Sequence, residues 1–193
     1  MIINAEKFEA LRKDINFVIF DVDGTLTDGK IYMGKDGELF KAFDIKDGCA
    51  IHDIMPKNNL VPIIMTARSS QIVINRCKEL GITEYYQGVR NKLEKLKEIA
   101  DANGISDDNG VYNQIAYVGD DIIDIECMKH CGIVACPADA VEQVKEISDF
   151  ISARNGGNGA VRDFIEALVK WCFTKTNWLK NQLVVFCFTI WYL

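Results

Sequence analysis

The hydrophobic residues of this chain gather in short runs that alternate with charged, helix-like stretches. The clearest runs are Phe17–Phe20, Val61–Met65 and 115–118. Short apolar runs bounded by turn residues are typical of buried strands, and the stretches between them have the length of helices. This alternation predicts an α/β fold with a Rossmann-like, doubly wound parallel sheet.

The spacing between the runs leaves no room for a second domain. An alternating segment around Gly34 to Gly37 predicts a β-hairpin, which we interpret as a flap. Between Thr66 and Lys92 there is room for one helix and a short strand, whereas an independent domain needs about 50 residues. We therefore expect one domain over residues 1–170 with no separate cap domain, followed by an apolar extension over 171–193.

Polar residues follow each apolar run where the strand is expected to end. They are Asp21 and Asp23, then Thr66 and Arg68, then Asp120, Asp121 and Asp124. Residues two apart in an extended segment point to the same side, so Asp21 and Asp23 can face one small volume. Two bare carboxylates repel unless a cation offsets them, which points to a divalent metal. The alternative is an Asx-rich turn after a strand.

A lysine completes a set of groups that could hold a phosphoryl group. Lys92 opens the helical segment 92–100, where the helix N-terminus adds partial positive charge. Ligands of parallel sheets bind beyond the carboxyl ends of the strands, where the acids are expected. Hard oxygen ligands without a convergent His/Cys set favour Mg²⁺ over zinc.

The order of these residues resembles the four motifs of the haloacid dehalogenase superfamily of phosphotransferases, DxDGT, Thr or Ser, Lys, and GDDxxD. The resemblance implies that Asp21 is a nucleophile that forms an aspartyl-phosphate. Asp23 would protonate the leaving oxygen and later deprotonate water, and Thr66 and Lys92 would bind the phosphoryl oxygens.

The same resemblance implies a Mg²⁺ site. Asp120 would join Asp21 and the backbone carbonyl of Asp23 on the metal, with Asp121 or Asp124 supporting it through water. The metal would neutralise charge and align the phosphate for in-line attack.

Further segments resemble one lidless branch of this superfamily, the 3-deoxy-D-manno-octulosonate 8-phosphate phosphatases and the related nonulosonate 9-phosphate phosphatases. They include FDVDGTLTDGKIYMGKDGE and SARNGGNGAVRDF. The resemblance implies a phosphatase acting on 3-deoxy-D-manno-octulosonate 8-phosphate in lipopolysaccharide or other surface-glycan biosynthesis, with a nonulosonate 9-phosphate as the alternative substrate. It also implies a homotetramer, with Lys46, Arg68 and Arg162 as sugar or carboxylate contacts. Ala67 stands where members commonly carry Gly, which leaves the sugar open.

The late glycines give a second indication of substrate class. Gly156, Gly157 and Gly159 would let the backbone approach a bulky leaving group closely, and Arg162 could pair with its carboxylate. We therefore expect an eight- or nine-carbon α-keto sugar acid phosphorylated at its far end.

Two functional classes compete for this chain. Domains of this branch also occur fused to acylneuraminate cytidylyltransferases, as a non-catalytic oligomerisation module. The presence of Asp21, Asp23, Lys92 and Asp120 favours the enzyme. A phosphotransferase with another acceptor or a dehalogenase is less favoured, since a dehalogenase would not need Asp23 or the metal acids.

Charge and cysteine content narrow the partners and the compartment. The net charge of −6 and a pI near 5.0 argue against nucleic-acid binding, which needs clustered Lys and Arg. The 7 cysteines form no CxxC pair, and no N-terminal signal is visible, so we expect a cytoplasmic protein.

The last residues, 183–193, are nearly all apolar. A membrane span needs about 20 apolar residues, so a membrane contact is not favoured. We favour two interpretations of this segment: an element packed on a neighbouring subunit, or a sequence that is not part of the natural protein. An interfacial membrane contact is the third interpretation.

Overall fold

The computed structural model of the chain describes residues 1–169, so the extension expected over 171–193 lies outside the described residues. The strands are β1 (Phe17–Phe20), β2 (Tyr32–Gly34), β3 (Gly37–Phe40), β4 (Val61–Met65), β5 (Glu84–Tyr86), β6 (Tyr112–Val118), β7 (Cys131–Cys136) and β8 (Phe150–Ile151). The helices are α1 (Ala5–Leu11), α2 (Ile45–Cys49), α3 (Gln71–Glu79), α4 (Lys92–Ala102), α5 (Ile125–Met128) and α6 (Glu142–Ile147). A π-helical turn (Ala50–Ile54) follows α2, two 3₁₀ turns lie at Pro56–Asn58 and Ile122–Asp124, and residues 160–169 are helical.

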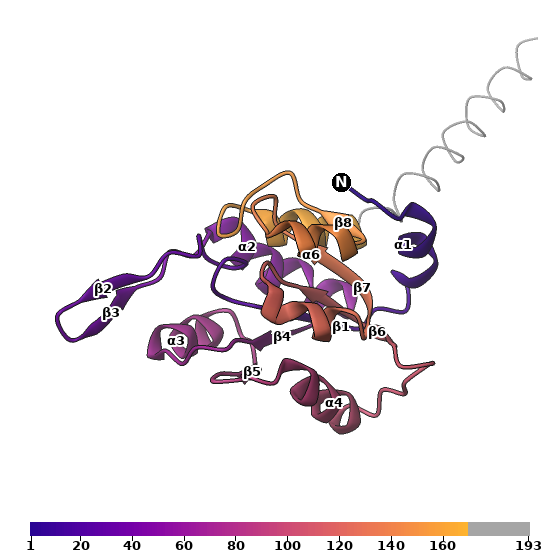
Figure 1. Ribbon diagram of the computed structural model, residues 1–193, viewed down its shortest axis with the longest axis horizontal. Helices are drawn as coiled ribbons and strands as arrows, with labels where there is room; N and C mark the ends of the chain where they lie inside the picture. Colours follow the sequence, from indigo (N-terminus) through magenta and orange to yellow (C-terminus); the bar gives the residue numbers. More distant parts are fainter. Residues whose placement is uncertain (170–193) are drawn as a thin grey trace, which may run out of the picture.

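Six strands form one parallel sheet in the order β5-β4-β1-β6-β7-β8 (Figure 1). β1 lies at the centre and pairs with β4 on one side and β6 on the other. The chain runs outward from β1 to β5 and then returns to β6, so the direction of winding switches beside β1. Open α/β sheets bind ligands at the carboxyl ends of the strands next to such a switch point. The predicted doubly wound parallel sheet is confirmed.

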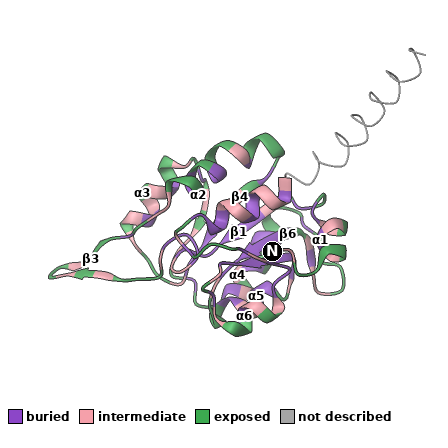
Figure 2. Cartoon of the chain, turned by 90° about the horizontal axis from the view of Figure 1, so that it is seen from above, coloured by how far each residue is buried: buried purple, intermediate pink, exposed green. Residues whose placement is uncertain are grey.

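Helices cover both faces of the sheet, and each face has its own hydrophobic core. Along β1, Val18 and Phe20 belong to one core and Ile19 to the other, as the alternation of side chains in a strand requires. The first core is closed by α1, α3, the π-helical turn and helix 160–169, and the second by α4, α5 and α6. Figure 2 shows the buried central strands beneath helices whose outer faces are exposed. β1 therefore holds the residues that follow it on a rigid support.

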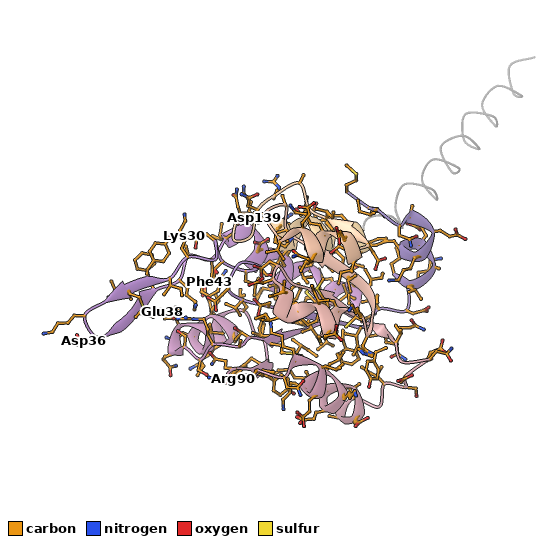
Figure 3. The ribbon with its side chains drawn as sticks, in the orientation of Figure 1. Lys30, Asp36, Glu38, Phe43, Arg90 and Asp139 are labelled. Atoms are coloured by element: carbon orange, nitrogen blue, oxygen red, sulfur yellow. The ribbon has the colours of Figure 1, made fainter. Side chains whose placement is uncertain are left out.

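The predicted hairpin is present as a separate antiparallel sheet of β2 and β3. Its turn includes Gly37, whose φ of +124° favours glycine, and the stacked rings of Tyr32 and Phe40 lie 4.3 Å apart. The hairpin projects from the body of the domain beyond α2 and α3 (Figure 1). In Figure 3, Asp36 marks its outer end, whereas Glu38 lies nearer the body. Only the side chains at the inner end of the hairpin therefore lie close enough to contact the body of the domain.

The segment between Thr66 and Lys92 holds only α3 and β5, so it contains no cap domain. No helix within residues 1–169 is long and apolar enough to cross a lipid bilayer. The five cysteines in this range are free thiols.

Candidate active site

The ends of three neighbouring strands bring the predicted acids to one edge of the sheet. Phe20 at the end of β1 pairs in register with Ile64 of β4 and Val118 of β6. The N–H of Asp21 continues this pattern by donating to the carbonyl of Val118 at 3.0 Å. The segments that begin at Asp21, Thr66 and 119 therefore leave the sheet side by side.

Lys92 reaches this edge from the first turn of α4. Its Nζ lies 2.6 Å from Oδ1 of Asp21 and 2.6 Å from Oδ1 of Asp124, and the lysine side chain is buried. Asn91 caps the helix by accepting the N–H of Glu94, so the lysine stands at the positive end of α4. One ammonium thus bridges two buried carboxylates that would otherwise repel each other.

Asp124 is the most completely held of the acids. It is fully buried, accepts the hydroxyl of Tyr117 at 2.7 Å, and accepts the N–H groups of Asp120 and Asp121 at 3.2 and 3.3 Å. Asp121 is exposed and caps the 3₁₀ turn by accepting the N–H of Ile122. Of the two acids that the sequence left open as support for a metal, Asp124 faces the buried centre and Asp121 faces solvent.

The side chain of Asp120 lies against Gly24 and Thr25, the two residues that follow Asp23. Thr25 donates its hydroxyl to Oδ1 of Asp120 at 2.9 Å. A Cβ atom on Gly24 would lie 2.0 Å from Oδ2 of Asp120, and Gly24 has a φ of +98°. The glycine is therefore required both by its backbone conformation and by the space that the carboxylate occupies.

The three acids Asp21, Asp120 and Asp124 form a cluster suited to a cation. Each has a carboxylate oxygen within 4.8 Å of those of the other two. Burial raises the pKa of Asp21 to about 7 although Lys92 opposes the rise, and burial together with Asp21 raises the pKa of Asp120 to about 7. For Lys92, burial alone would lower the pKa, but the two carboxylates outweigh it and the pKa is raised. Two buried carboxylates and one half-buried carboxylate with one ammonium lack positive charge, so this all-oxygen set fits a hard divalent cation.

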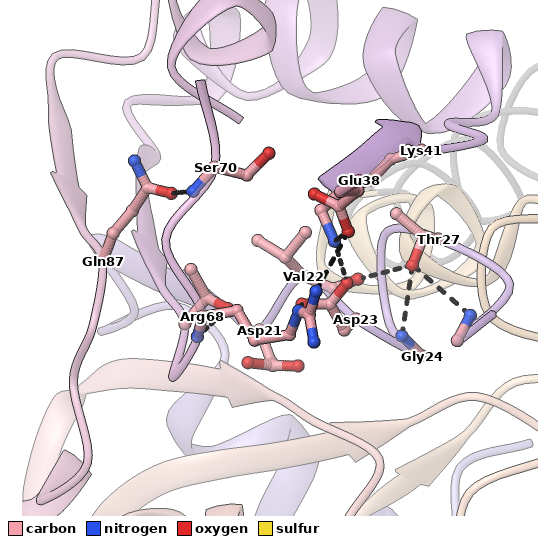
Figure 4. A network of polar contacts seen from close by, with 12 residues as sticks. Asp21, Val22, Asp23, Gly24, Thr27, Glu38, Lys41, Arg68, Ser70 and Gln87 are labelled. Carbon is pink, nitrogen blue, oxygen red and sulfur yellow. Dashed lines mark hydrogen bonds and ion pairs between the residues drawn. The ribbon is translucent and has the colours of Figure 1, made fainter. Parts of the chain in front are cut away.

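Asp23 lies in a second network beside this cluster (Figure 4). Its Oδ1 is paired with Nζ of Lys41, which also lies 2.9 Å from Glu38. Nη2 of Arg68 lies 3.3 Å from Glu38, and Nε of Arg68 lies 3.8 Å from Oδ2 of Asp23. Lys41 and Glu38 come from the hairpin, so the flap meets the rest of the site at Asp23. The sequence indicates that Asp21 and Asp23 can share one volume, but their side chains engage different partners.

The family resemblance implies three sugar contacts. Within residues 1–169, only one of them, Arg68, has a side chain that contacts an acid of the site. The side chain of Arg68 is 43% exposed. Lys46 is exposed on α2. The guanidinium of Arg162 is paired with Glu166 at 2.8 Å, and its backbone N–H donates to Asp47.

The late glycines pack against the loop after β1 of the same chain. A Cβ on Gly156 would lie 1.8 Å from the carbonyl oxygen of Gly24, and one on Gly157 would lie 2.5 Å from the carbonyl carbon of Thr27. The N–H of Gly157 donates to the carbonyl of Thr25 at 3.1 Å. The close backbone approach that the sequence predicts is present at Gly156 and Gly157, where the partner is the chain's own loop; the approach to a bulky leaving group stays a prediction.

Comparison with known proteins places these features in a family. No family model matches the chain. The chain is 39% identical over 160 residues to the 3-deoxy-D-manno-octulosonate 8-phosphate phosphatase KdsC of Escherichia coli K12. The aligned region covers 83% of this chain and 82% of the relative.

Solved structures agree with the sequence relatives. The Moraxella catarrhalis 3-deoxy-D-manno-octulosonate 8-phosphate phosphatase, solved with magnesium, phosphate and the sugar acid, has a TM-score of 0.80 at 34% identity, covering 86% of this chain and 92% of that one. The cobalt-bound Haemophilus influenzae phosphatase has a TM-score of 0.76 at 31% identity, covering 82% and 90%. The chain therefore belongs to the 3-deoxy-D-manno-octulosonate 8-phosphate phosphatase family of the haloacid dehalogenase superfamily.

Proposed function

We propose that the protein is a Mg²⁺-dependent phosphatase that hydrolyses 3-deoxy-D-manno-octulosonate 8-phosphate to the free sugar acid and phosphate. The observation that carries the proposal is the bridging of Asp21 and Asp124 by Lys92 at the carboxyl edge of the sheet, with Asp120 in reach of both acids. This arrangement supplies a buried nucleophile, a local cation and oxygen ligands in one place. Its family membership supports the same reaction.

In the proposed reaction Asp21 attacks the phosphorus and forms an aspartyl-phosphate. Lys92 holds Oδ1 of Asp21, and Oδ2 makes the attack. Thr66 and Lys92 bind the phosphoryl oxygens, and Lys92 offsets the charge that gathers there. Asp23 gives a proton to the leaving oxygen in the first half of the reaction and takes one from water in the second.

The carboxylates of Asp21 and Asp120 and the backbone carbonyl of Asp23 would hold Mg²⁺, with Asp124 or Asp121 in support. When bound, the metal supplies charge neutralisation and alignment of the phosphoryl group. The fit rests on the shortage of positive charge among the carboxylates of Asp21, Asp120 and Asp124, two of them buried and Asp120 half-buried.

Substrate choice is the finest part of the proposal. The exposed guanidinium of Arg68 is available to a sugar carboxylate, and Lys46 and Arg162 are proposed as further contacts. The test is a phosphate-release screen over sugar-acid phosphates, hexose phosphates and nonulosonate 9-phosphates, with and without Mg²⁺. We expect 3-deoxy-D-manno-octulosonate 8-phosphate to give the highest kcat/KM. A preference for hexose phosphates, or equal rates in excess chelator, would contradict the proposal.

We also propose that the protein works as a cytoplasmic homotetramer. The projecting hairpin supports this assembly because it exposes the large apolar side chains Ile31, Met33, Leu39 and Phe40. Apolar groups exposed together on a protrusion favour burial against another copy. Light scattering at assay concentration should give four times the mass of one chain, and a fully active monomer would refute the assembly. The free thiols support a reducing compartment.

A further inference from the structure

Lys41 is a buried ammonium that the reaction described so far does not use. Its side chain is 1% exposed and lies between the carboxylates of Asp23 and Glu38. At that exposure it cannot touch a sugar or a phosphoryl group that enters from solvent. Lys41 can therefore act on the reaction only through its two partners, and of these Asp23 is the one with a chemical role.

The contacts of the two Asp23 oxygens are unequal. Oδ1 is engaged by Nζ of Lys41. Oδ2 accepts no hydrogen bond from the described residues, and Nε of Arg68 lies 3.8 Å from it, beyond hydrogen-bond reach. Asp23 is thus held by one oxygen and open at the other.

Glu38 in turn holds Lys41. Its Oε1 lies 2.9 Å from Nζ of Lys41 and 3.3 Å from Nη2 of Arg68, so it gives the ammonium a second carboxylate partner besides Asp23. Glu38 lies in β3 and Lys41 directly follows that strand, and Figure 4 shows both side chains beside Asp23. Because buried ion pairs are often no more stabilising than apolar residues of the same volume, stability alone is a weak reason for this arrangement.

We propose that Lys41, fixed by Glu38, is a positioning residue for proton transfer by Asp23. It holds Oδ1, which leaves Oδ2 to deliver the proton. As the bond from Asp21 Oδ2 to phosphorus forms, the bond from phosphorus to the sugar oxygen breaks, and the proton on Asp23 Oδ2 passes to that oxygen. The sugar leaves as an alcohol, and Asp23 becomes a carboxylate whose new charge lies against Lys41.

This proposal rests on the proposed phosphatase function, and it predicts a dependence on the leaving group. Departure of a weakly basic group such as p-nitrophenolate needs little protonation, whereas an alkoxide cannot leave without it. A defect in delivering the proton should therefore grow with the basicity of the leaving group. A defect in folding or in phosphate binding would affect all substrates equally.

The experiment compares wild-type protein with Lys41→Met on a series of aryl phosphates, from p-nitrophenyl to phenyl phosphate, and on the sugar-acid phosphate, all with Mg²⁺. We expect kcat/KM of the variant to fall less than about 3-fold for p-nitrophenyl phosphate and about 10- to 100-fold for the alkyl ester. Lys35→Met, at the exposed turn of the same hairpin, is the matched control and should match wild type throughout.

Glu38→Gln keeps Asp23 and Lys41 but weakens the hold on the ammonium, so it should give the same trend with smaller factors. It also serves if Lys41→Met does not fold, which thermal melts would reveal. Equal losses across the series, or no loss at all, would overturn the positioning role. If wild-type protein hydrolysed none of these esters with Mg²⁺, the result would refute the proposed phosphatase function itself. If it hydrolysed aryl esters but preferred another sugar phosphate, only the substrate assignment would be wrong, and the comparison of the variants would still test the positioning role.

Discussion

Asp21 and Asp23 are two residues apart, yet they belong to differently built halves of the site. Asp21 lies in a half made by strand ends and the first turn of a helix, where Lys92, Asp124 and Tyr117 are all buried. Asp23 lies in a half made by a projecting hairpin and the partly exposed Arg68. The first half is as rigid as the core, whereas the second depends on how the hairpin is held.

The largest expected effect is the loss of turnover when the nucleophile of the buried half is replaced without changing its volume. Asp21→Asn removes the nucleophile but keeps its volume, so turnover should fall more than about 10³-fold. Phosphate release measures the activity, and circular dichroism should show an unchanged fold. Hydrolysis at the wild-type rate would show that the nucleophile lies elsewhere.

Metal removal is the next largest effect and should act on the same half. Excess chelator should reduce activity about 100-fold or more, since the metal supplies charge that the acids lack. Saturating Mg²⁺ at 100 times its Kd should stabilise the fold by about 2.7 kcal/mol, read as a rise in Tm. Asp120→Asn should remove most of that rise. An equal rise in the variant would exclude Asp120 as a ligand.

A smaller effect tests how firmly the buried half is braced. Tyr117→Phe removes the hydroxyl that donates to Asp124 at 2.7 Å and should cost about 1.5–3 kcal/mol of unfolding free energy. Denaturant titration measures the loss. Because Asp124 keeps Lys92 and two backbone donors, we expect activity to fall less than about 10-fold. A variant as stable as wild type would show that the hydroxyl adds no net stability.

The smallest effect uses a buried carboxylate outside both halves. Asp47 accepts the N–H groups of Gly159 and Arg162, and burial raises its pKa to about 6 in spite of these bonds. Because this lies above the usual 3.8, the protonated form stabilises the fold at pH 4, and this contribution is lost as the pH rises through 6.

The side chain in Asp47→Asn stays neutral at every pH. The difference in unfolding free energy between wild type and this variant should therefore change by about 1–2 kcal/mol from pH 4 to pH 7. Urea titrations at a series of pH values measure it. A difference that does not vary with pH would contradict the raised pKa.

The rigid half was largely predictable from the sequence, and the reason is physical. Strands of a parallel sheet are buried on both faces, so β1 and β4 read as continuous apolar runs whose ends can be located. The segments that begin at Asp21, Thr66 and 119 were therefore expected at one edge, and the structure brings them there. Tyr117 was missed because an aromatic residue inside an apolar run reads as core until the position of Asp124 is known.

The hairpin half was harder to predict. The hairpin itself was expected from its alternation and turn residues, but Glu38 and Lys41 on such a strand look like a solvated charge pair. Only the docking of the hairpin turns them inward. The late glycines show the same limit, because the sequence of Gly156 and Gly157 permits a close backbone contact without naming the partner.

The contact between Gly156 and Gly24 has a consequence for how mutational maps of this protein should be read. With a Cβ only 1.8 Å from the carbonyl oxygen of Gly24, Gly156→Ala must displace either its own loop or the backbone next to Asp23. In a saturation scan scored by activity, this position would tolerate as little change as Asp21, although it offers no functional group. Its invariance in a lineage would record a steric constraint, and ranking positions by intolerance alone would mistake packing for chemistry.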